Sequence, residues 1–190
     1  MSRIQLGFHI NAKKCIGCFT CAMACKNMYH QPVAVLWRKL YPLDESIYPF
    51  SHRGFYSLAC NHCETPACQA ACPVGAYTKR VRDGVVIHDQ DKCIGCGNCI
   101  RSCPFGAPQY NPVLRKAEKC SLCWQRLDQG LKPACVLSCP VEALELKDFC
   151  KADLSSLLAF PPGFPVTSGI NPSVRFTLPQ SPCIVRQEMP

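Results

Sequence analysis

Apolar residues recur along two short segments that each run into a cysteine-rich stretch. These segments are residues 4–10, IQLGFHI, and residues 84–88, GVVIH, and runs of this length and composition predict β-strands. An Asp-Gly pair, a hairpin signal, precedes the second segment, so residues 76–80 are expected to pair with residues 85–88. A short helix is expected after the third cysteine of each cysteine-rich stretch.

A longer segment, residues 27–59, separates the first two cysteine-rich stretches. It contains the near-alternating run VAVLWRKLY at residues 33–41, followed by a proline-bearing stretch through Phe50. Alternation of this kind predicts a strand. We interpret the whole segment as a strand followed by a surface excursion.

The last part of the sequence, residues 151–190, holds seven of the seventeen prolines and has little periodicity. Such a tail is expected to be extended and to form no core by itself. NPSVRFTLP at residues 171–179 has enough apolar character to favour docking on a partner. The most apolar stretch near the end, residues 154–160, is followed by two prolines. No apolar run in the sequence reaches the eighteen or so residues of a membrane helix.

The cysteines carry the strongest signal, because sixteen of the eighteen form four quartets that each end in a C-x3-C step. This spacing binds 4Fe-4S clusters in bacterial ferredoxins, so four quartets predict four clusters. Quartet one is Cys15, Cys18, Cys21 and Cys25; quartet two is Cys60, Cys63, Cys68 and Cys72; quartet three is Cys93, Cys96, Cys99 and Cys103; quartet four is Cys120, Cys123, Cys135 and Cys139.

Residues beside the ligands fit this chemistry. In two-cluster ferredoxins the fourth cysteine of a quartet binds the neighbouring cluster. Gly17 and Gly95 separate the first two ligands of quartets one and three, where a missing side chain would let the backbone approach inorganic sulfide. A proline, at position 73, 104 or 140, follows the last cysteine of three quartets and would turn the backbone away.

Two other uses of cysteine compete with iron-sulfur clusters. Disulfides staple short secreted proteins, but this sequence shows no signal-peptide pattern, and closely repeated C-x2-C pairs are poorly placed for ordinary bridges. Zinc is the better alternative, since paired C-x2-C motifs build four-thiolate sites, but it leaves no role for a third cysteine two residues on.

The formal charge of +8 agrees with clusters. Each oxidised 4Fe-4S centre with four thiolates carries about −2, so four centres contribute about −8. The basic excess therefore need not indicate nucleic acid. The residues that flank the quartets and could offset cluster charge are Lys13, Lys14, Lys79, Arg80, Arg82, Lys92, Arg101, Arg115, Lys116 and Lys119.

A few other residues suggest roles of their own. His62 could replace a thiolate as in Rieske centres, but quartet two is already complete. Trp124 is interpreted as a packing residue rather than an electron relay. Cys150 and Cys183, outside every quartet, are expected to be buried thiols that act as small apolar residues. Two basic residues, at positions 26 and 126, are candidates for tuning a terminal cluster.

Over residues 5–148 the sequence resembles the four-cluster electron-transfer subunit of the dimethyl sulfoxide reductase family of molybdenum and tungsten enzymes. The motifs that carry the resemblance are CIGCFTCAMACK, CNHCETPACQAACPVGA, the D-x-x-K-C-I-G-C start of quartet three, CPFGAPQYN, and the long-gapped quartet four with KPACVLSCP. The tail and parts of residues 27–59 match loosely.

The resemblance implies an α+β fold of two pseudo-symmetric bacterial ferredoxin-like modules, each with two 4Fe-4S clusters. Module A would comprise residues 1–26 and 105–150, and module B residues 60–104, with an insertion at 27–59 and an extended partner-docking tail at 151–190. The implied ligand sets are set 1 (Cys15, Cys18, Cys21, Cys139), set 2 (Cys60, Cys63, Cys68, Cys103), set 3 (Cys72, Cys93, Cys96, Cys99) and set 4 (Cys25, Cys120, Cys123, Cys135).

The resemblance also implies a function in anaerobic respiration. Single electrons would pass through four 4Fe-4S clusters between a large molybdenum- or tungsten-pterin catalytic subunit and a membrane anchor subunit that handles quinone, or another carrier. We expect no catalytic residue and no nucleic-acid partner. Membrane association would come through partner subunits, on either face, and export would rely on a partner because no twin-arginine leader is found.

Two alternatives stay open from the sequence. The first is a free-standing polyferredoxin that shuttles electrons by diffusion, although such a protein has no need of a long tail. The second is a cluster-based sensor or a zinc-organised scaffold, although no effector domain is visible.

Overall fold

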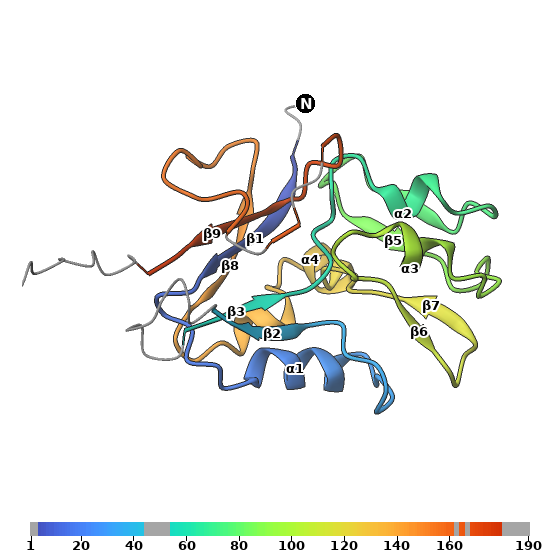
Figure 1. The fold of residues 1–190 in the computed structure, drawn as a ribbon, viewed down its shortest axis with the longest axis horizontal. Coiled ribbons are helices and arrows are strands. Elements are labelled where there is room, and N and C mark those ends of the chain that lie inside the picture. The colour runs from blue at the N-terminus through green and yellow to red at the C-terminus, as the bar shows by residue number, and fades with distance from the viewer. Residues whose placement is uncertain (1–3, 44–53, 162–163, 166–167, 180–190) are drawn as a thin grey trace, which may run out of the picture.

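The computed structural model describes residues 4–43, 54–161, 164–165 and 168–179, which form a mixed α/β fold of short elements (Figure 1). The helices are α1 (Thr20–Met28), α2 (Ala67–Ala70), α3 (Asn98–Ser102), α4 (Trp124–Asp128) and α5 (Ala134–Leu137). The strands are β1 (Leu6–Asn11), β2 (Lys39–Pro42), β3 (Phe55–Leu58), β4 (Tyr77–Lys79), β5 (Val86–His88), β6 (Gln109–Asn111), β7 (Lys116–Glu118), β8 (Leu144–Asp148) and β9 (Val174–Thr177).

The largest sheet has the strand order β8-β1-β9. Strand β1 is the strand predicted before quartet one, and it pairs antiparallel with β8, which follows quartet four, with Phe8 opposite Leu146. On its other edge β1 pairs in parallel with β9, with Phe8 opposite Val174. The sheet therefore brings the region before quartet one and the region after quartet four side by side, as Figure 1 shows.

Three two-stranded hairpins complete the strands of the described residues. The hairpin predicted between quartets two and three is confirmed, because β4 and β5 pair antiparallel with Tyr77 opposite His88. Strands β6 and β7 form a second hairpin between quartets three and four, and β2 pairs with β3.

The four quartets share one local geometry. In each quartet a helix begins one residue before the third cysteine, so that Cys21, Cys68, Cys99 and Cys135 are each the second residue of a helix. The prediction that helices follow the third cysteine was therefore wrong about where they begin. The reason is that the third cysteine itself lies in the first helical turn, which buries its thiol in all four cases.

The segment between quartets one and two folds differently from its prediction. The expected strand at residues 33–41 is reduced to β2, which begins at Lys39, and residues 33–34 form a turn. Residues 37 and 38 fold inward: Trp37 packs on the core and the Arg38 side chain has 0% exposure. Most of the predicted surface excursion, residues 44–53, lies outside the described residues.

The described part of the tail packs on its own chain. Val174 and Phe176 of β9 are buried, and Phe164 stacks on Phe105 with ring centroids 5.2 Å apart. The prediction that Cys150 is buried was wrong, because it lies exposed in a turn after β8. Cys183 lies outside the described residues.

The helices pair between quartets that are distant in sequence. Helix α1 of quartet one packs on α5 of quartet four, and α2 of quartet two packs on α3 of quartet three. Figure 1 places α2, α3, β5, β6 and β7 on one side, and α1 with the β8-β1-β9 sheet on the other. Among the described residues, no helix has the length and apolar character needed to cross a bilayer.

Candidate iron-sulfur centres

The fold brings Cys139 of quartet four to the first three cysteines of quartet one. Burial raises the pKa of the Cys15 thiol, the Gly17 backbone N–H lowers it, and the neighbouring thiols of Cys21, Cys139 and Cys18 raise it further. The packing of α5 on α1 agrees with this, because Cys139 closely follows α5 and Cys21 lies in the first turn of α1.

A second group forms deeper in the same half of the molecule. Burial and the neighbouring Cys135 thiol are the main causes that raise the pKa of Cys25 to about 11. Burial also raises the pKa of Cys120 well above its ordinary value, with Cys25 as the largest neighbouring contribution. The fourth cysteine of quartet one therefore lies among the first three of quartet four, with Cys123 also near Cys25.

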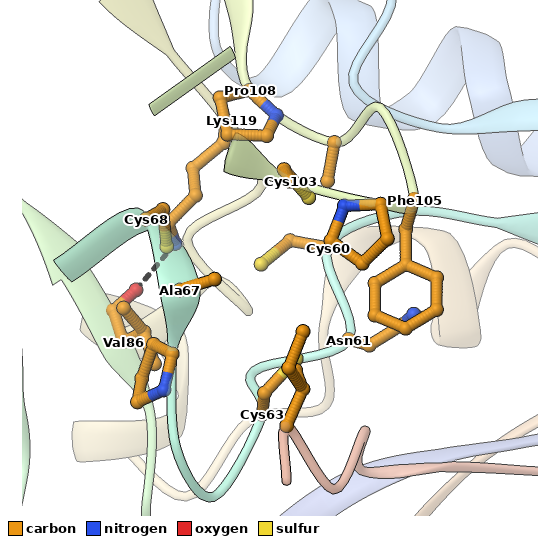
Figure 2. Close-up of a pocket in the computed structure, with 14 residues that line it drawn as sticks. Cys60, Asn61, Cys63, Ala67, Cys68, Val86, Cys103, Phe105, Pro108 and Lys119 are labelled. Carbon is orange, nitrogen blue, oxygen red and sulfur yellow. Dashed lines mark hydrogen bonds between the residues drawn. The ribbon is translucent and has the colours of Figure 1, made fainter. Parts of the chain in front are cut away.

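A third group surrounds a pocket lined by Cys60, Cys63, Cys68 and Cys103 (Figure 2). Burial raises the pKa of Cys63, and the thiols of Cys60, Cys103 and Cys68 raise it further. Mainly through burial and the Cys60 thiol, the pKa of Cys68 rises to about 12. Cys103, the last cysteine of quartet three, thus lies with the first three of quartet two.

The fourth group brings the last cysteine of quartet two, Cys72, near cysteines of quartet three. Cys72 and Cys93 pack against a small core that contains buried Cys99 and Tyr77. Burial raises the pKa of Cys99, the Tyr77 hydroxyl beside it lowers the pKa, and the Cys93 and Cys96 thiols raise it.

Neighbouring groups influence one another electrostatically in a linear order. The Cys21 thiol is among the neighbours that raise the pKa of Cys135, after the larger effects of burial, Arg38 and Cys123. The Cys60 thiol similarly contributes to the raised pKa of Cys120, and that of Cys99 to the raised pKa of Cys68. The groups therefore follow the order set 1, set 4, set 2, set 3.

The two ends of this order reach the surface. Cys18 of set 1 and Cys96 of set 3 are the two quartet cysteines that are exposed. A hydrogen bond from the Thr20 hydroxyl to the Cys18 thiol, 3.3 Å long, lowers the pKa of Cys18. Apolar side chains surround both positions: Ile16 is 61% exposed, Phe19 48% and Ile94 64%.

Two buried cations lie among the thiols. Burial alone lowers the pKa of Arg38, but the thiols of Cys135, Cys120, Cys21 and Cys25 together raise it above its ordinary value. Lys119, one of the predicted flanking cations, is 3% exposed and lines the set 2 pocket. Its ammonium group donates to the carbonyl oxygen of Val86, the dashed line in Figure 2, and to that of Cys120 at 3.0 Å.

Most of the other predicted flanking cations lie nearer the surface. Arg80 bonds to Asp83 and Asp128, and the Lys79 ammonium donates to the carbonyl oxygens of Cys63 and Gly84. Lys116 is half-buried and donates to the Gln90 carbonyl oxygen. The exposed members are Lys13, Lys14, Arg82, Lys92, Arg101 and Arg115.

Buried donors without partners fit an iron-sulfur cluster. Arg38 Nε and Nη2, His62 Nε2 and Tyr77 Oη are fully buried and have no hydrogen-bond partner of ordinary geometry. Each lies beside or among the quartet cysteines, and such atoms are costly to bury unsatisfied. Inorganic sulfides and iron-bound thiolates accept hydrogen bonds, so a cluster in each group would supply the missing acceptors.

The donor set agrees with this fit. Soft thiolates are the ligands of iron-sulfur clusters. The raised pKa values mean that the free thiols resist ionisation, and the positive charge of iron offsets that cost when the ligand is bound. Among the described residues, no group of three or more His, Cys, Asp or Glu side chains has an arrangement that could hold a single metal ion.

The two ligand-loop glycines make room for protein atoms. A Cβ at Gly17, where φ is 69°, would lie 2.5 Å from the Phe55 ring, and one at Gly95, where φ is 72°, would lie 2.2 Å from the Arg115 carbonyl oxygen. The expectation that the missing side chain serves approach to sulfide remains a prediction.

The other residues with suggested roles have structural partners. His62 Nδ1 accepts the Val86 backbone N–H at 3.0 Å, and burial with nearby cations holds the His62 pKa well below its usual range. Trp124 packs on the core as predicted, with the Arg80 guanidinium 5.5 Å from its ring.

The two candidate tuning residues bond to backbone oxygens. Lys26 donates to the Pro32 and Val35 carbonyl oxygens. Arg126 donates to the Lys132 carbonyl oxygen. The tuning role suggested for each of them remains a prediction.

Sequence reasoning missed Arg38 and Ser57. Arg38 Nη1 donates to Ser57 O and Ser57 Oγ, both at 3.1 Å, and Ser57 Oγ lies 3.4 Å from Cys21 Sγ. The only signal was that the apolar run VAVLW is followed by a basic pair, Arg38 and Lys39.

Comparison with known proteins agrees with this geometry. The family described as 4Fe-4S dicluster domain matches residues 52–149. The sequence is 43% identical over 149 residues to the B subunit of anaerobic dimethyl sulfoxide reductase from Escherichia coli, covering 74% of this protein and 72% of the relative. It is 33% identical over 169 residues to the formate dehydrogenase iron-sulfur subunit of Wolinella succinogenes, covering 75% and 81%.

A further relative is the B subunit of sulfite dehydrogenase from Allochromatium vinosum, which is 33% identical over 160 residues, covering 73% of this protein and 67% of the relative. These matches extend over most of each protein, and the quartets have the spacing that binds 4Fe-4S clusters. This protein belongs to the 4Fe-4S dicluster family and is an iron-sulfur electron-transfer subunit of the dimethyl sulfoxide reductase type, with four 4Fe-4S clusters as its cofactors.

Proposed function

We propose that this protein passes single electrons along four 4Fe-4S clusters between a molybdenum- or tungsten-pterin catalytic subunit and a quinone-reactive membrane subunit or another carrier. The observation that carries the proposal is the linear order of the four cysteine groups, with an exposed cysteine at each end. A relay needs neighbouring centres close together inside the protein and terminal centres near its surface. The arrangement has both properties.

The ligand sets of the proposal are the crossed sets implied by the family resemblance. Support comes from the neighbours of individual thiols: Cys139 lies with set 1, Cys25 with set 4 and Cys103 with set 2. For set 3, Cys72 packs in the same small core as Cys93 and Cys99. In the proposed sets, the fourth cysteine of each quartet joins the first three of another.

The proposal includes two ferredoxin-like modules. Module A, residues 1–26 and 105–150, would hold sets 1 and 4, and module B, residues 60–104, would hold sets 2 and 3. The packing of α1 on α5 and of α2 on α3 supports this division. Further support comes from the residues that precede these helices. Phe19 before α1 and Gly97 before α3 have left-handed φ values of 60° and 75°, whereas a proline, Pro66 or Pro133, precedes α2 and α5, so each proposed module has one helix of each kind.

Each bound cluster accepts or donates one electron without making or breaking a substrate bond. The protein's part is to hold the thiolates, to exclude water and to set the local charge. Eight of the sixteen quartet cysteines are buried, and they are Cys21, Cys25, Cys60, Cys68, Cys99, Cys120, Cys123 and Cys135. Burial and positive charge both change cluster potentials.

The partner surfaces would lie at the two ends of the relay. The exposed apolar residues near Cys18 and Cys96, above all Ile16 and Ile94, are suited to contact with other subunits. The relatives are named as chains or subunits of larger oxidoreductases, which supports an obligate complex. Membrane association through an anchor subunit and docking of the tail, residues 151–190, belong to the same proposal.

The test is anaerobic purification of the tagged protein from its own host, with analysis of iron, acid-labile sulfide, zinc, molybdenum and tungsten. The expected result is about sixteen iron and about sixteen sulfide atoms per polypeptide, in a complex that also contains molybdenum or tungsten. The alternative, a free-standing polyferredoxin, predicts the same iron and sulfide but a single size-exclusion peak near the mass of one polypeptide. Stoichiometric zinc without sulfide would contradict both.

A further inference from the structure

The Arg38 side chain is the largest fully buried side chain in the described residues, with 0% exposure. It comes from the segment between quartets one and two, just before β2, and reaches across the core so that its guanidinium carbon lies 4.4 Å from the centroid of the Phe8 ring. A buried guanidinium is always charged, because its pKa lies above 12. Such a charge is strongly unfavourable unless other groups compensate it.

The protein compensates this charge only in part. Nη1 donates to Ser57 O and to Ser57 Oγ, both at 3.1 Å. Nε and Nη2, which carry three of the five N–H donors of a guanidinium, have no partner of ordinary geometry. No carboxylate in the described part of the sequence forms an ion pair with Arg38. A purely structural arginine at this depth would normally have its donors and its charge satisfied.

Thiols from two ligand sets surround the guanidinium instead. The thiols that raise its pKa, in order of their effect, are Cys135, Cys120, Cys21 and Cys25. Cys21 belongs to set 1, and the other three belong to set 4. Arg38 therefore lies at the boundary between the first two centres of the proposed relay.

Lys119 is a second buried cation, and its nitrogen, unlike Arg38 Nε and Nη2, has oxygen partners. Its ammonium group donates to two backbone carbonyl oxygens, those of Val86 and Cys120. Arg38 differs because Nε and Nη2 have no oxygen partner, and the side-chain neighbour that its guanidinium meets instead is the Cys135 thiol, whose pKa it lowers. Arginine also suits a position between two centres, since its charge is delocalised and its donors point in several directions.

We infer that Arg38 is the counter-charge shared by the two clusters of sets 1 and 4, and that its Nε and Nη2 groups donate to their sulfur atoms and raise the reduction potentials of both. The inference rests on the ligand sets proposed above. The fixed positive charge of Arg38 would stabilise the extra negative charge of a reduced cluster, and Arg38 itself would take up no proton because a guanidinium stays protonated. Arg38 is thus a positioning and tuning residue for electron transfer, not a ligand.

The test compares three variants of the full-length protein, purified anaerobically with its clusters. Arg38→Met removes the charge and the donors at similar volume, and Arg38→Lys keeps the charge but loses the planar fork. Arg175→Met is the matched control, because Arg175 also lies over a phenylalanine ring, Phe149 at 5.2 Å, and donates to the carbonyl oxygens of Pro172 and Val174. The readouts are iron and sulfide content and a redox titration followed by electron paramagnetic resonance.

In Arg38→Met, two of the four midpoint potentials should fall, each by at least a tenfold change in the reduction equilibrium, which is about 59 mV for one electron. The other two potentials should not move, and Arg38→Lys should give a smaller fall. Arg175→Met should leave all four unchanged. Four unchanged potentials in an Arg38→Met protein with full iron and sulfide would overturn the inference.

Incomplete cluster assembly in the variant is also a decisive result. If Arg38→Met lacks two clusters and Arg38→Lys restores them, the requirement is for charge, as inferred. If Arg38→Lys lacks the same clusters, shape rather than charge is required and the inference is wrong. The iron and sulfide content of the wild-type protein tests the proposed function separately. A wild-type protein without four clusters would contradict the proposed ligand sets, whatever the variants show.

Discussion

Ser57 Oγ lies 3.4 Å from Cys21 Sγ. The same oxygen accepts a hydrogen bond from Arg38 Nη1 at 3.1 Å, so the Ser57 hydroxyl hydrogen is free to point at Cys21. When Cys21 is an iron-bound thiolate it accepts only, and Ser57 must then be the donor. A hydrogen bond to a ligand sulfur stabilises the reduced, more negative cluster and raises its potential.

Ser57→Ala should therefore lower the potential of the cluster in set 1. A hydrogen bond of this kind contributes about 1 kcal/mol, which is roughly 40 mV for a one-electron couple. Redox titration followed by electron paramagnetic resonance measures the shift. Ser57→Thr, which keeps the hydroxyl, should retain most of the wild-type potential, and an equal fall in both variants would contradict a role for the hydrogen bond.

Cys139→Ser tests the crossed ligand sets. Because Cys139 lies among Cys15, Cys18 and Cys21, the substitution should change the spectrum or the iron content of the set 1 cluster and leave the set 4 cluster intact. Electron paramagnetic resonance of the reduced protein distinguishes the two. Cys150→Ser is the matched control, since Cys150 is exposed and belongs to no quartet, and it should alter no cluster. A change confined to the set 4 cluster would refute the crossed assignment.

The ligands were predictable from sequence because their spacing is local. Each C-x2-C and C-x3-C step places its thiols within one loop and one helical turn, whatever the rest of the sequence does. The hairpin of β4 and β5 was predictable for the same reason, since an Asp-Gly turn determines it locally. The start of each helix was misplaced because the third cysteine could not be distinguished from the residues that precede a helix.

Arg38 was not predictable because its environment is created by contacts distant in sequence. Its neighbours come from β1, β3, α1 and α5, and only folding brings them together. Sequence pattern treats an arginine in a near-alternating run as an exposed position of a strand. Cys150 was misjudged for a related reason, since a lone cysteine is usually buried but here follows the end of β8 in an exposed turn.

Gly95→Ala should destabilise the loop that holds Cys93 and Cys96. A Cβ there would lie 2.2 Å from the Arg115 carbonyl oxygen, and φ is 72°, so both a backbone clash and left-handed strain oppose the substitution. We expect loss of iron from the set 3 cluster and a lower thermal midpoint. Gly75→Ala is the matched control, because φ is 61° but a Cβ would meet nothing within 4 Å. It should cost only about 1 kcal/mol of left-handed strain. Equal effects of the two substitutions would show that strain alone matters.

Cluster retention should rise with pH over an unusually wide range. In the cluster-free fold the pKa of Cys25 is about 11 and that of Cys68 about 12, against an ordinary value of 9.0, so these thiols stay protonated well above neutrality. Raised pKa values stabilise the cluster-free fold below pH 9, and this stability is lost as the pH rises through about 11 to 12. Cluster binding must displace those protons, so each rise in pH favours the bound state.

The measurement is the rate at which an iron chelator bleaches the visible absorbance of the protein at a series of pH values. Bleaching should slow steadily from about pH 7 to about pH 11, because buried thiols remain protonated in the product over that whole interval. A rate that becomes constant above about pH 9.5 would mean that the released thiols titrate like exposed cysteines. Such a plateau would show that burial does not raise their pKa values in the cluster-free protein, and that the thiols become exposed to water when the iron leaves.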